Sequence, residues 1–228
     1  MLTYDKSDRT YIDSTNVVSQ SKFNLAPPTF NSSYTAKRLV DITGSIVIIF
    51  ALLSWFVPII SCLIYFTSPG PIFFIQIRTG KNGRIFHCYK FRTMYVCRSG
   101  DFKQAEKNDP RITSIGRWLR KSNLDELPQF FNVLIGDMSL IGPRPHPPQL
   151  DAQFWHEIPL YEKRYQVYPG ITGLAQVKGA RGITDHPLKM KHRVKFDLFY
   201  QKNQSLALDL TIGWWTIKSM VKGDANAW

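Results

Sequence analysis

The sequence predicts an α+β protein that is mainly helical and held at a membrane from one side, a monotopic arrangement. Three features support this fold class: a long apolar run at residues 39–66, two short β-prone stretches around a glycine-containing turn at residues 80–83, and amphipathic helical patterns after residue 110. They predict an N-terminal re-entrant membrane helix, a small β-hairpin and interfacial amphipathic helices. The expected division is a flexible N-terminal extension at residues 1–35, a membrane helix at 36–67 and a folded domain at 68–228.

The apolar run is long enough to cross a bilayer. From Leu39 to Phe66, about 28 residues carry a single charge, at Asp41, whereas a membrane-spanning helix needs about 20 residues. The run starts too late and is too long for a signal peptide. Both of its flanks are basic, so the positive-inside rule gives no clear direction. The basic residues on the two flanks are Lys37, Arg38, Arg78, Lys81 and Arg84.

Pro58 lies inside this run and bears on how the helix sits in the membrane. A proline removes one backbone hydrogen bond and kinks or breaks a helix. A helix kinked at this point can enter and leave the bilayer on the same side, which leaves both basic flanks at the cytoplasmic face. We prefer this re-entrant interpretation, although a simple membrane span fits the sequence nearly as well.

A β-hairpin is predicted directly after the membrane helix. The stretches "IFFIQI" and "RIFHCYKFRTM" are rich in β-branched and aromatic residues and flank the turn Gly80-Lys81-Asn82-Gly83. Strand alternation places four side chains of the second stretch on one face, namely Phe86, Cys88, Lys90 and Arg92. The two cations among them either point into a site or lie on a solvated face; the pattern leaves both open.

The rest of the chain reads as a polar loop and helices. Residues 96–110 are polar and predict a mobile loop, and residues 187–220 predict helix with an interruption at 203–205. Residues 111–122 predict a short amphipathic helix, whose tryptophan beside basic residues suits a membrane interface. Its apolar stripe is formed by Ile112, Ile115, Trp118 and Leu119.

Two adjacent carboxylates, Asp125 and Glu126, stand out in a chain with a net charge of +12. One interpretation is local: Ser122 caps a helix that starts at Asn123, Asp125 is the acid of a capping box, and Glu126 complements the helix dipole. This leaves Pro128 unexplained, because a proline that far into a helix disturbs it. We therefore favour a backbone that turns around Leu127-Pro128, with the acid pair at a helix start.

Several cations surround the acid pair in the sequence. Arg120 lies five residues before Asp125, and Arg144 lies in the rigid turn Gly142-Pro143-Arg144-Pro145, which aims a guanidinium at an oxyanion with little ordering cost. Lys90 and Arg92 add positive charge. Acids among arginines suit phosphoryl chemistry, which needs charge neutralisation around a positioned nucleophile. No RNA- or DNA-reading motif accompanies the basic charge, so we expect no nucleic-acid partner.

From Ala36 onward the sequence resembles the bacterial sugar transferases, the monotopic polyprenyl-phosphate phosphoglycosyltransferases. The resemblance rests on many blocks in order: "KRLVD", "SPGPIFFIQIRTGKNGRIFHCYKFRTM", "DPRIT", "GRWLRKSNLDELPQFFNVLIGDMSLIGPRP", "YPGITGLAQVKGARG" and "FDLFYQKNQSLALDL". It implies transfer of a sugar 1-phosphate from a UDP-sugar to undecaprenyl phosphate, with release of UMP. It also implies a re-entrant helix broken near a Ser-Pro pair, whereas here Ser54 and Pro58 are separated.

The resemblance also implies roles for individual residues. Asp125 is the expected nucleophile and contacts the required Mg²⁺, while Glu126 assists proton transfer. Arg120 holds phosphate and Arg144 orients the nucleotide. Two further positions match residues linked to activity, Lys90 and Asp197. Arg92, two residues after Lys90, is expected to add to substrate binding.

The branch and the cellular setting follow from the same resemblance. The stretch "GARGITDHPLKMKHRVKFDLFY" is most similar to the branch that transfers glucose 1-phosphate in exopolysaccharide synthesis of the colanic-acid type. We expect a catalytic domain on the cytoplasmic face of the bacterial inner membrane. A homo-oligomer and downstream glycosyltransferases stay open as further partners. The alternatives are a non-catalytic membrane scaffold of a polysaccharide machine and a metal-dependent phosphohydrolase.

Overall fold

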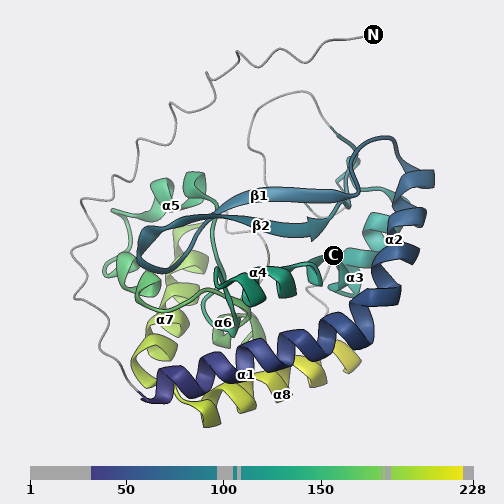
Figure 1. The fold of residues 1–228 in the computed structure, drawn as a ribbon. Helices are drawn as coiled ribbons and strands as arrows, with labels where there is room; N and C mark the ends of the chain where they lie inside the picture. The colour runs from purple at the N-terminus through teal and green to yellow at the C-terminus, as the bar shows by residue number, and fades with distance from the viewer. Residues whose placement is uncertain (1–31, 97–104, 107–108, 181, 183–185, 223–228) are drawn as a thin grey trace, which may run out of the picture.

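The computed structural model describes residues 32–96, 105–106, 109–180, 182 and 186–222. Within these ranges the protein is mainly helical with two small sheets (Figure 1). The helices are α1 (Ser32–Ile48), α2 (Ser54–Thr67), α3 (Ser114–Lys121), α4 (Gln129–Ile135), α5 (Pro148–Phe154), α6 (Leu174–Val177), α7 (Pro187–Asn203) and α8 (Leu206–Lys222). The strands are β1 (Phe73–Thr79), β2 (Ile85–Phe91), β3 (Ser139–Ile141) and β4 (Gly170–Thr172). The predicted extension up to residue 31 and most of the predicted loop at 96–110 lie outside the described residues.

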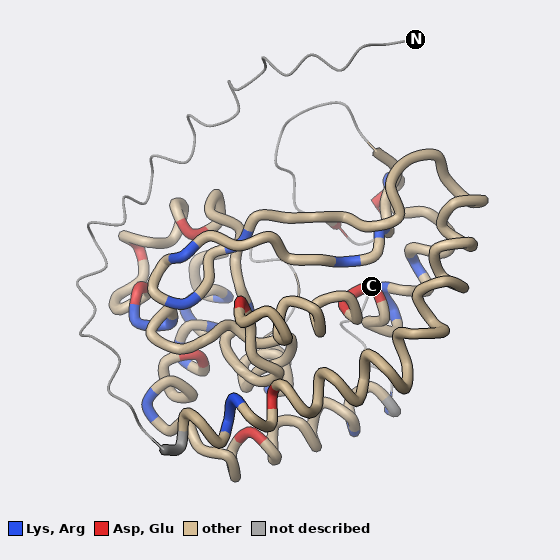
Figure 2. Tube along the Cα trace, in the orientation of Figure 1, with Lys and Arg blue, Asp and Glu red and all other residues tan. Residues whose placement is uncertain are grey.

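The predicted apolar helix is present and begins at Ser32, four residues before the expected boundary. Tyr34–Thr67 forms one helical stretch that is long and apolar enough to cross a membrane, and most of its surface is not covered by the rest of the chain. Its charged residues lie near its start, and the remainder is uncharged (Figure 2). The predicted membrane-compatible helix is therefore confirmed.

The distortion in this helix lies before Pro58 rather than at it. A π-helical turn, Ile49–Leu53, separates α1 from α2, and Pro58 itself lies within regular α2. In the π turn the Ser54 amide donates to the Ile49 carbonyl, one residue further back than in an α-helix. The Ser54 hydroxyl also donates to the Phe50 carbonyl over 2.7 Å. The proline ring crowds the carbonyl four residues earlier, that of Ser54, and the wide turn absorbs this crowding. Figure 1 shows α2 rising away from the line of α1.

The predicted hairpin is confirmed in position. β1 and β2 pair antiparallel, with Phe74 opposite Lys90 and Gln76 opposite Cys88. Phe86, Cys88 and Arg92 are all buried, and Lys90 is partly buried. The solvated-face interpretation of the two cations was therefore wrong, because this face of the sheet packs onto α4 and the core. Figure 1 shows α4 between the hairpin and α1.

A second sheet, which the sequence did not predict, joins distant segments. β3 and β4 pair parallel, with Ser139 opposite Gly170. The two backbones come so close after β3 that a Cβ atom on Gly142 would lie 2.3 Å from the Tyr168 carbonyl oxygen. Likewise, a Cβ atom on Gly170 would lie 2.1 Å from the Gly142 nitrogen. Glycine is required at both positions for this close approach, so these glycines set where the following Pro143-Arg144 segment lies.

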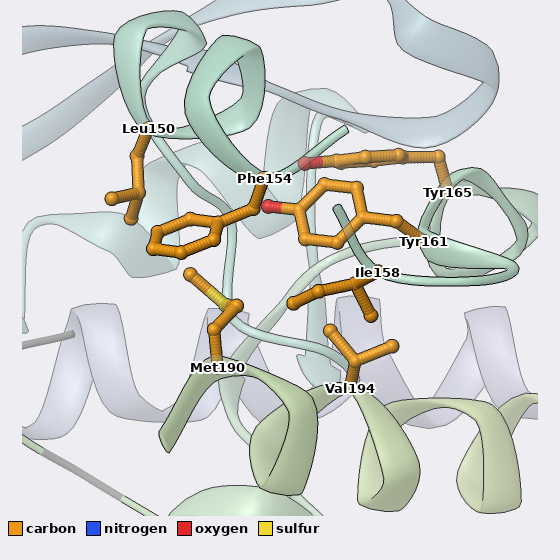
Figure 3. Close-up of a cluster of buried hydrophobic side chains, with 7 residues drawn as sticks. All are labelled: Leu150, Phe154, Ile158, Tyr161, Tyr165, Met190 and Val194. Atoms are coloured by element: carbon orange, nitrogen blue, oxygen red, sulfur yellow. The ribbon is translucent and has the colours of Figure 1, made fainter. Parts of the chain in front are cut away.

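The C-terminal helices complete the domain. The predicted break is confirmed, because α7 ends at Asn203 and α8 starts at Leu206. Figure 1 shows α8 alongside α1. α7 covers a cluster of buried side chains from α5 and the following 3₁₀ segment, with Met190 and Val194 below the rings of Tyr161 and Tyr165 (Figure 3). Arg164, which lies over the rings of Tyr161 and Tyr165, donates to the Arg144 carbonyl and so links this cluster to the segment that carries Arg144.

Candidate active site

The acid pair lies in a short 3₁₀ turn, Leu124–Glu126, between α3 and α4. The capping-box interpretation was wrong: Ser122 ends α3, and its hydroxyl donates back to the Trp118 carbonyl over 2.8 Å. Asn123 then takes a left-handed conformation (φ 56°), which turns the chain. Pro128 lies immediately before α4, where its missing N–H costs nothing. The predicted turn at Leu127-Pro128 is confirmed, whereas the acid pair lies in the 3₁₀ turn ahead of it and α4 starts only at Gln129.

Glu126 is held by two cations from different parts of the chain. Lys90 from β2 donates to Oε1 over 2.6 Å, and the Arg144 guanidinium binds both carboxylate oxygens, at 2.5 and 3.1 Å. Burial alone would raise the pKa of Glu126, but the charges and hydrogen bonds of Arg144 and Lys90 outweigh it and lower that pKa well below its usual range. Glu126 is therefore a stable carboxylate that fixes two cations at the site.

Asp125 differs from its neighbour Glu126 in its hydrogen bonding. The residue is only 9 % exposed, and no residue that the structure describes donates a hydrogen bond to its carboxylate or pairs with it. Burial, and next the charge of Glu126, raise the pKa of Asp125 to about 6, against the opposing charges of Lys90, Arg120 and Arg144. The carboxylate is thus mostly ionised at neutral pH and has no bond to break before it reacts.

Arg120 lies close to this carboxylate and keeps part of its guanidinium available. Its Nε donates to the Thr93 hydroxyl over 2.9 Å, and Nη2 approaches the Met94 sulfur at 3.6 Å. The charge of Asp125 is the largest influence that raises the Arg120 pKa, while burial, the dominant cause, lowers it. Its Nη1 makes no hydrogen bond to any described residue, so this nitrogen is placed to bind an anion beside Asp125.

Arg92 binds the residues that follow α2 and does not bind the acid pair. Its guanidinium donates to the carbonyls of Ser68 and Pro69 at 2.7 and 3.0 Å, and to the Ser68 hydroxyl at 2.9 Å. Among the described residues it shares no hydrogen bond or ion pair with the acid pair. Arg92 therefore holds the end of α2 against β2, and its predicted part in substrate binding stays a prediction.

Asp197 reaches the site only through a second residue, Arg164. Its carboxylate oxygen Oδ2 accepts from Arg164 Nε and Nη2 at 3.1 and 2.8 Å, and both side chains are fully buried. Arg164 in turn donates to the Arg144 carbonyl over 2.7 Å. Asp197 is thus a positioning residue for the Arg144 segment in this structure, not a group beside Asp125.

Sequence reasoning missed Arg164, whose side chain lies next to that of His146 in the fold. Arg164 also contacts His146 Nδ1 at 2.6 Å, and its guanidinium lies over the rings of Tyr161 and Tyr165, 5.4 and 5.2 Å from their centroids. Burial, and then the charges of Arg164 and Arg193, lower the pKa of His146 well below its usual value. A buried arginine bonded through all its nitrogens is not visible in the sequence, because its partners come from segments up to 33 residues away.

The described residues contain no group of three or more His, Cys, Asp or Glu side chains arranged to hold a metal ion. A Mg²⁺ ion nevertheless fits the acid pair, because magnesium is usually bound by one or two carboxylates together with substrate phosphates and waters. Asp125 supplies a carboxylate without a hydrogen-bond donor, which is the ligand such an ion needs. Glu126 is already occupied by Lys90 and Arg144, so Asp125 is the residue that would hold the ion.

The site combines an unpartnered carboxylate, a carboxylate held by two cations and a third cation nearby. It lies beside a helix that is apolar enough for a bilayer. These features define a membrane-associated site for phosphoryl-group chemistry. The chain belongs to the bacterial sugar transferase family, whose family model matches residues 32–223. The predicted family resemblance is therefore confirmed.

Relatives with assigned names are similar over most of this chain. It is 46 % identical over 182 residues to the UDP-glucose:undecaprenyl-phosphate glucose-1-phosphate transferase of Klebsiella pneumoniae, covering 79 % of this chain and 39 % of that protein. It is 44 % identical over 188 residues to the exopolysaccharide production protein PSS of Rhizobium leguminosarum bv. phaseoli, covering 80 % and 94 %. It is 44 % identical over 192 residues to the UDP-N-acetylgalactosamine-undecaprenyl-phosphate N-acetylgalactosaminephosphotransferase of Aeromonas hydrophila, covering 82 % and 44 %. The chain thus spans less than half the length of two of these three relatives.

Proposed function

We propose that this protein transfers glucose 1-phosphate from UDP-glucose to undecaprenyl phosphate, which yields undecaprenyl diphosphate glucose and UMP, as an early membrane step of exopolysaccharide synthesis. The observation that carries the proposal is the contrast within the acid pair: Asp125 is unpartnered, while Glu126 gathers Lys90 and Arg144 beside it. The names of the Klebsiella and Rhizobium relatives support the donor and the pathway class.

The first half of the reaction uses Asp125 as nucleophile. A carboxylate oxygen attacks the β-phosphorus of the UDP-sugar, the bond from that phosphorus to the bridging oxygen breaks, and UMP leaves with the electron pair. The product is an aspartyl phosphosugar, and no proton is exchanged. Arg120 and Arg144 are placed to bind phosphate oxygens, where fixed cations stabilise the charge of the transition state. When bound, Mg²⁺ would neutralise further charge on the diphosphate.

The second half transfers the phosphosugar to the lipid. A phosphate oxygen of undecaprenyl phosphate attacks the same phosphorus, a diphosphate bond forms and the Asp125 carboxylate is released. If the lipid phosphate arrives protonated, Glu126 is the nearest base. Its pKa is too low for that role while Arg144 and Lys90 hold it, so proton transfer requires these cations to move onto the substrate phosphates.

We also propose that the apolar helix is re-entrant and that the domain lies on the cytoplasmic face of the inner membrane. Both ends of the helix are attached to the same folded body. Near its start, Lys37 pairs with Asp209 of α8 over 2.7 Å. At its end, Arg92, which directly follows β2, binds the Ser68 carbonyl over 2.7 Å. One compact body lies on one side of a bilayer, so these attachments support a helix that enters and leaves on that side.

The reaction is tested by UMP release from protein purified in lipid nanodiscs, with Mg²⁺ and a panel of UDP-sugars, beside Asp125→Asn. We expect sustained UMP release only when undecaprenyl phosphate and UDP-glucose are both present, at most one equivalent of UMP per protein without the lipid, and none from the variant or in EDTA. Sugar phosphate released without the lipid would instead indicate a phosphohydrolase. No turnover with any UDP-sugar would favour a scaffold.

The topology is tested by labelling with a membrane-impermeant maleimide in spheroplasts. Single cysteines at Thr35 and Arg84, both exposed positions on the two flanks of the helix, are placed in a variant with the native cysteines changed to serine. A re-entrant helix protects both positions from outside label. Labelling of one position alone would show that the helix crosses the membrane.

A further inference from the structure

The start of the apolar helix carries a buried ion pair that bears on Arg144. Lys37 of α1 and Asp209 of α8 pair over 2.7 Å, and their side chains are 8 % and 10 % exposed. The Tyr200 hydroxyl, from α7, lies 2.6 Å from Asp209 Oδ1. We call Lys37, Asp209 and Tyr200 the anchor cluster. It joins α1 to the two consecutive C-terminal helices, α7 and α8.

This cluster holds one backbone carbonyl, that of Ile141. Lys37 Nζ donates to this carbonyl oxygen over 3.0 Å, and the Ser139 hydroxyl donates to it over 3.0 Å. The Tyr200 hydroxyl also lies 3.0 Å from it. One turn further along α1, Asp41 accepts from the Leu140 amide over 2.9 Å. The apolar helix therefore fixes the last two residues of β3 through its own charged side chains.

Ile141 directly precedes the segment that carries Arg144. Gly142 follows, with its amide bonded to the Thr172 carbonyl over 2.9 Å, and then Pro143, whose carbonyl accepts from the Gly170 amide over 2.9 Å. Proline on both sides of Arg144 leaves this short segment little freedom. A change in the direction of the Ile141 peptide is therefore passed on to Arg144, which lies three residues further along.

We propose that Lys37 and Asp209 are positioning residues for Arg144: the ion pair between the apolar helix and α8 sets where the Arg144 guanidinium meets the donor's diphosphate. This inference rests on the proposed function for the identity of the substrate. It adds that the membrane helix is part of the machinery that places a substrate-binding residue, beyond anchoring the domain. The blocks "KRLVD" and "LALDL" of the sequence contain the two residues.

The test compares wild-type protein with the double variant Lys37→Met/Asp209→Leu in nanodiscs. The double change removes the pair and the Lys37 bond to Ile141 without leaving one charge buried alone, a replacement that folded proteins often tolerate. Tyr200→Phe is a milder second variant that removes the hydroxyl beside the Ile141 carbonyl and Asp209 but keeps the ion pair and the aromatic ring. Thr216→Val is the matched control, because Thr216 joins α8 to β4 through Thr172 over 2.9 Å and has no bond to Ile141.

Two readouts separate positioning from general damage. In hydrogen–deuterium exchange, we expect faster uptake in the peptide over residues 138–146 in both variants, with the β1–β2 peptides unchanged. In kinetics, we expect the KM for the UDP-sugar to rise about ten-fold in the double variant, because small misplacements of a binding group are costly. The KM for undecaprenyl phosphate should stay the same, whereas a mere loss of folded protein would lower kcat and leave both KM values unchanged.

The possible outcomes each decide the matter. Faster uptake together with a higher donor KM in both variants, but not in Thr216→Val, supports the proposal. A folded double variant with wild-type uptake or a wild-type donor KM overturns it. If the wild-type protein turns over no UDP-sugar, the proposed function fails, and the exchange experiment alone still shows whether the anchor cluster controls the Arg144 segment.

Discussion

Two buried charged clusters contact the chain around Arg144, one at the Ile141 carbonyl and one at the Arg144 guanidinium, and they differ in how completely their charges are matched. In the anchor cluster, one cation faces one anion, and Lys37, Asp209 and Tyr200 all have partners within hydrogen-bond distance. In the acid-pair cluster, Glu126 takes both Lys90 and Arg144, and Asp125 is left without a bond to any described residue.

The difference teaches where chemistry is to be expected. Buried polar groups in folded proteins are almost always satisfied, so a fully matched cluster is explained by folding alone. A buried carboxylate without a partner costs stability, and a fold retains such a group where a ligand or substrate completes it. On this criterion the acid pair is the reactive centre and the anchor cluster is its support.

The largest effect on turnover is expected from a change at Asp125, in the cluster whose charges are not fully matched. Asp125→Asn should lower UMP release by at least about 10³-fold, because it removes the nucleophile. The same change should raise stability above pH 6 when measured in EDTA. The folded pKa is about 6 against an ordinary value of 3.8, so ionised Asp125 opposes folding increasingly from pH 4 to 6 and fully above it. The gain is on the order of 2 kcal/mol at pH 8 and disappears below pH 4.

A stability scan of Asp125→Asn from pH 4 to 8 checks the sign. Equal melting temperatures of the variant and the wild type at pH 8 would show that the carboxylate is better solvated than this structure indicates.

Glu126→Gln sharpens the contrast within the acid pair, since its effect on stability should have the opposite sign. The variant leaves Lys90 and Arg144 against a neutral amide, so we expect a loss of about 1–3 kcal/mol above pH 5. The lowered pKa of Glu126 means that its stabilising contribution is present above the ordinary carboxyl range and is lost on acidification. Turnover should fall about 10²-fold. Denaturant titrations of both variants, side by side, give the comparison; a gain of stability in both would contradict it.

In the anchor cluster, a single substitution should lower stability, and a second substitution at its partner should restore most of it. Lys37→Met leaves Asp209 buried with only the Tyr200 hydroxyl, and we expect a loss of about 3 kcal/mol. The further change Asp209→Leu should recover most of that loss, because an apolar pair replaces the ion pair. Thermal unfolding in nanodiscs measures both steps. A double variant that is less stable than Lys37→Met would show that the pair itself, rather than the orphaned charge, carries the energy.

The smallest expected effect is the contribution of His146 to the pH dependence of stability. His146 is kept neutral by burial and by the arginines that face it, Arg164, Arg193, Arg78 and Arg144, so its folded pKa lies well below 6.5. Below pH 6.5 the unfolded chain binds a proton that the folded protein does not, so stability falls by up to about 1.4 kcal/mol per pH unit as the pH drops. As the pH drops from 8 to 5, the melting temperature of the wild type should fall relative to that of His146→Gln, because only the wild type carries this histidine. Parallel curves would contradict this.

The local features of the chain were predictable because they depend on near neighbours. The apolar run, the hairpin and the break between α7 and α8 follow from residue periodicity and turn residues, and all are present. The positions of Asp125, Glu126, Arg120 and Arg144 could be picked out because acids, arginines and prolines gather within 25 residues. Their individual roles, including that of Mg²⁺, stay predictions.

What sequence reasoning missed depends on contacts between distant segments. The capping box at Ser122 was an equally local pattern, yet it was wrong, because Asn123 turns the chain toward Lys90 and Arg144. The pairing of Lys37 with Asp209 joins residues 172 positions apart. No short stretch of sequence contains both residues, so a local pattern cannot predict their pairing.

By itself, the sequence determined that the protein has a membrane-compatible helix, a hairpin and a family-typical set of acids and arginines, since these follow from composition and short-range order. Only the tertiary structure decided which carboxylate is bound and which is free. Hydrogen bonding and burial set the pKa and reactivity of a carboxyl group, and both are properties of the surroundings that folding assembles.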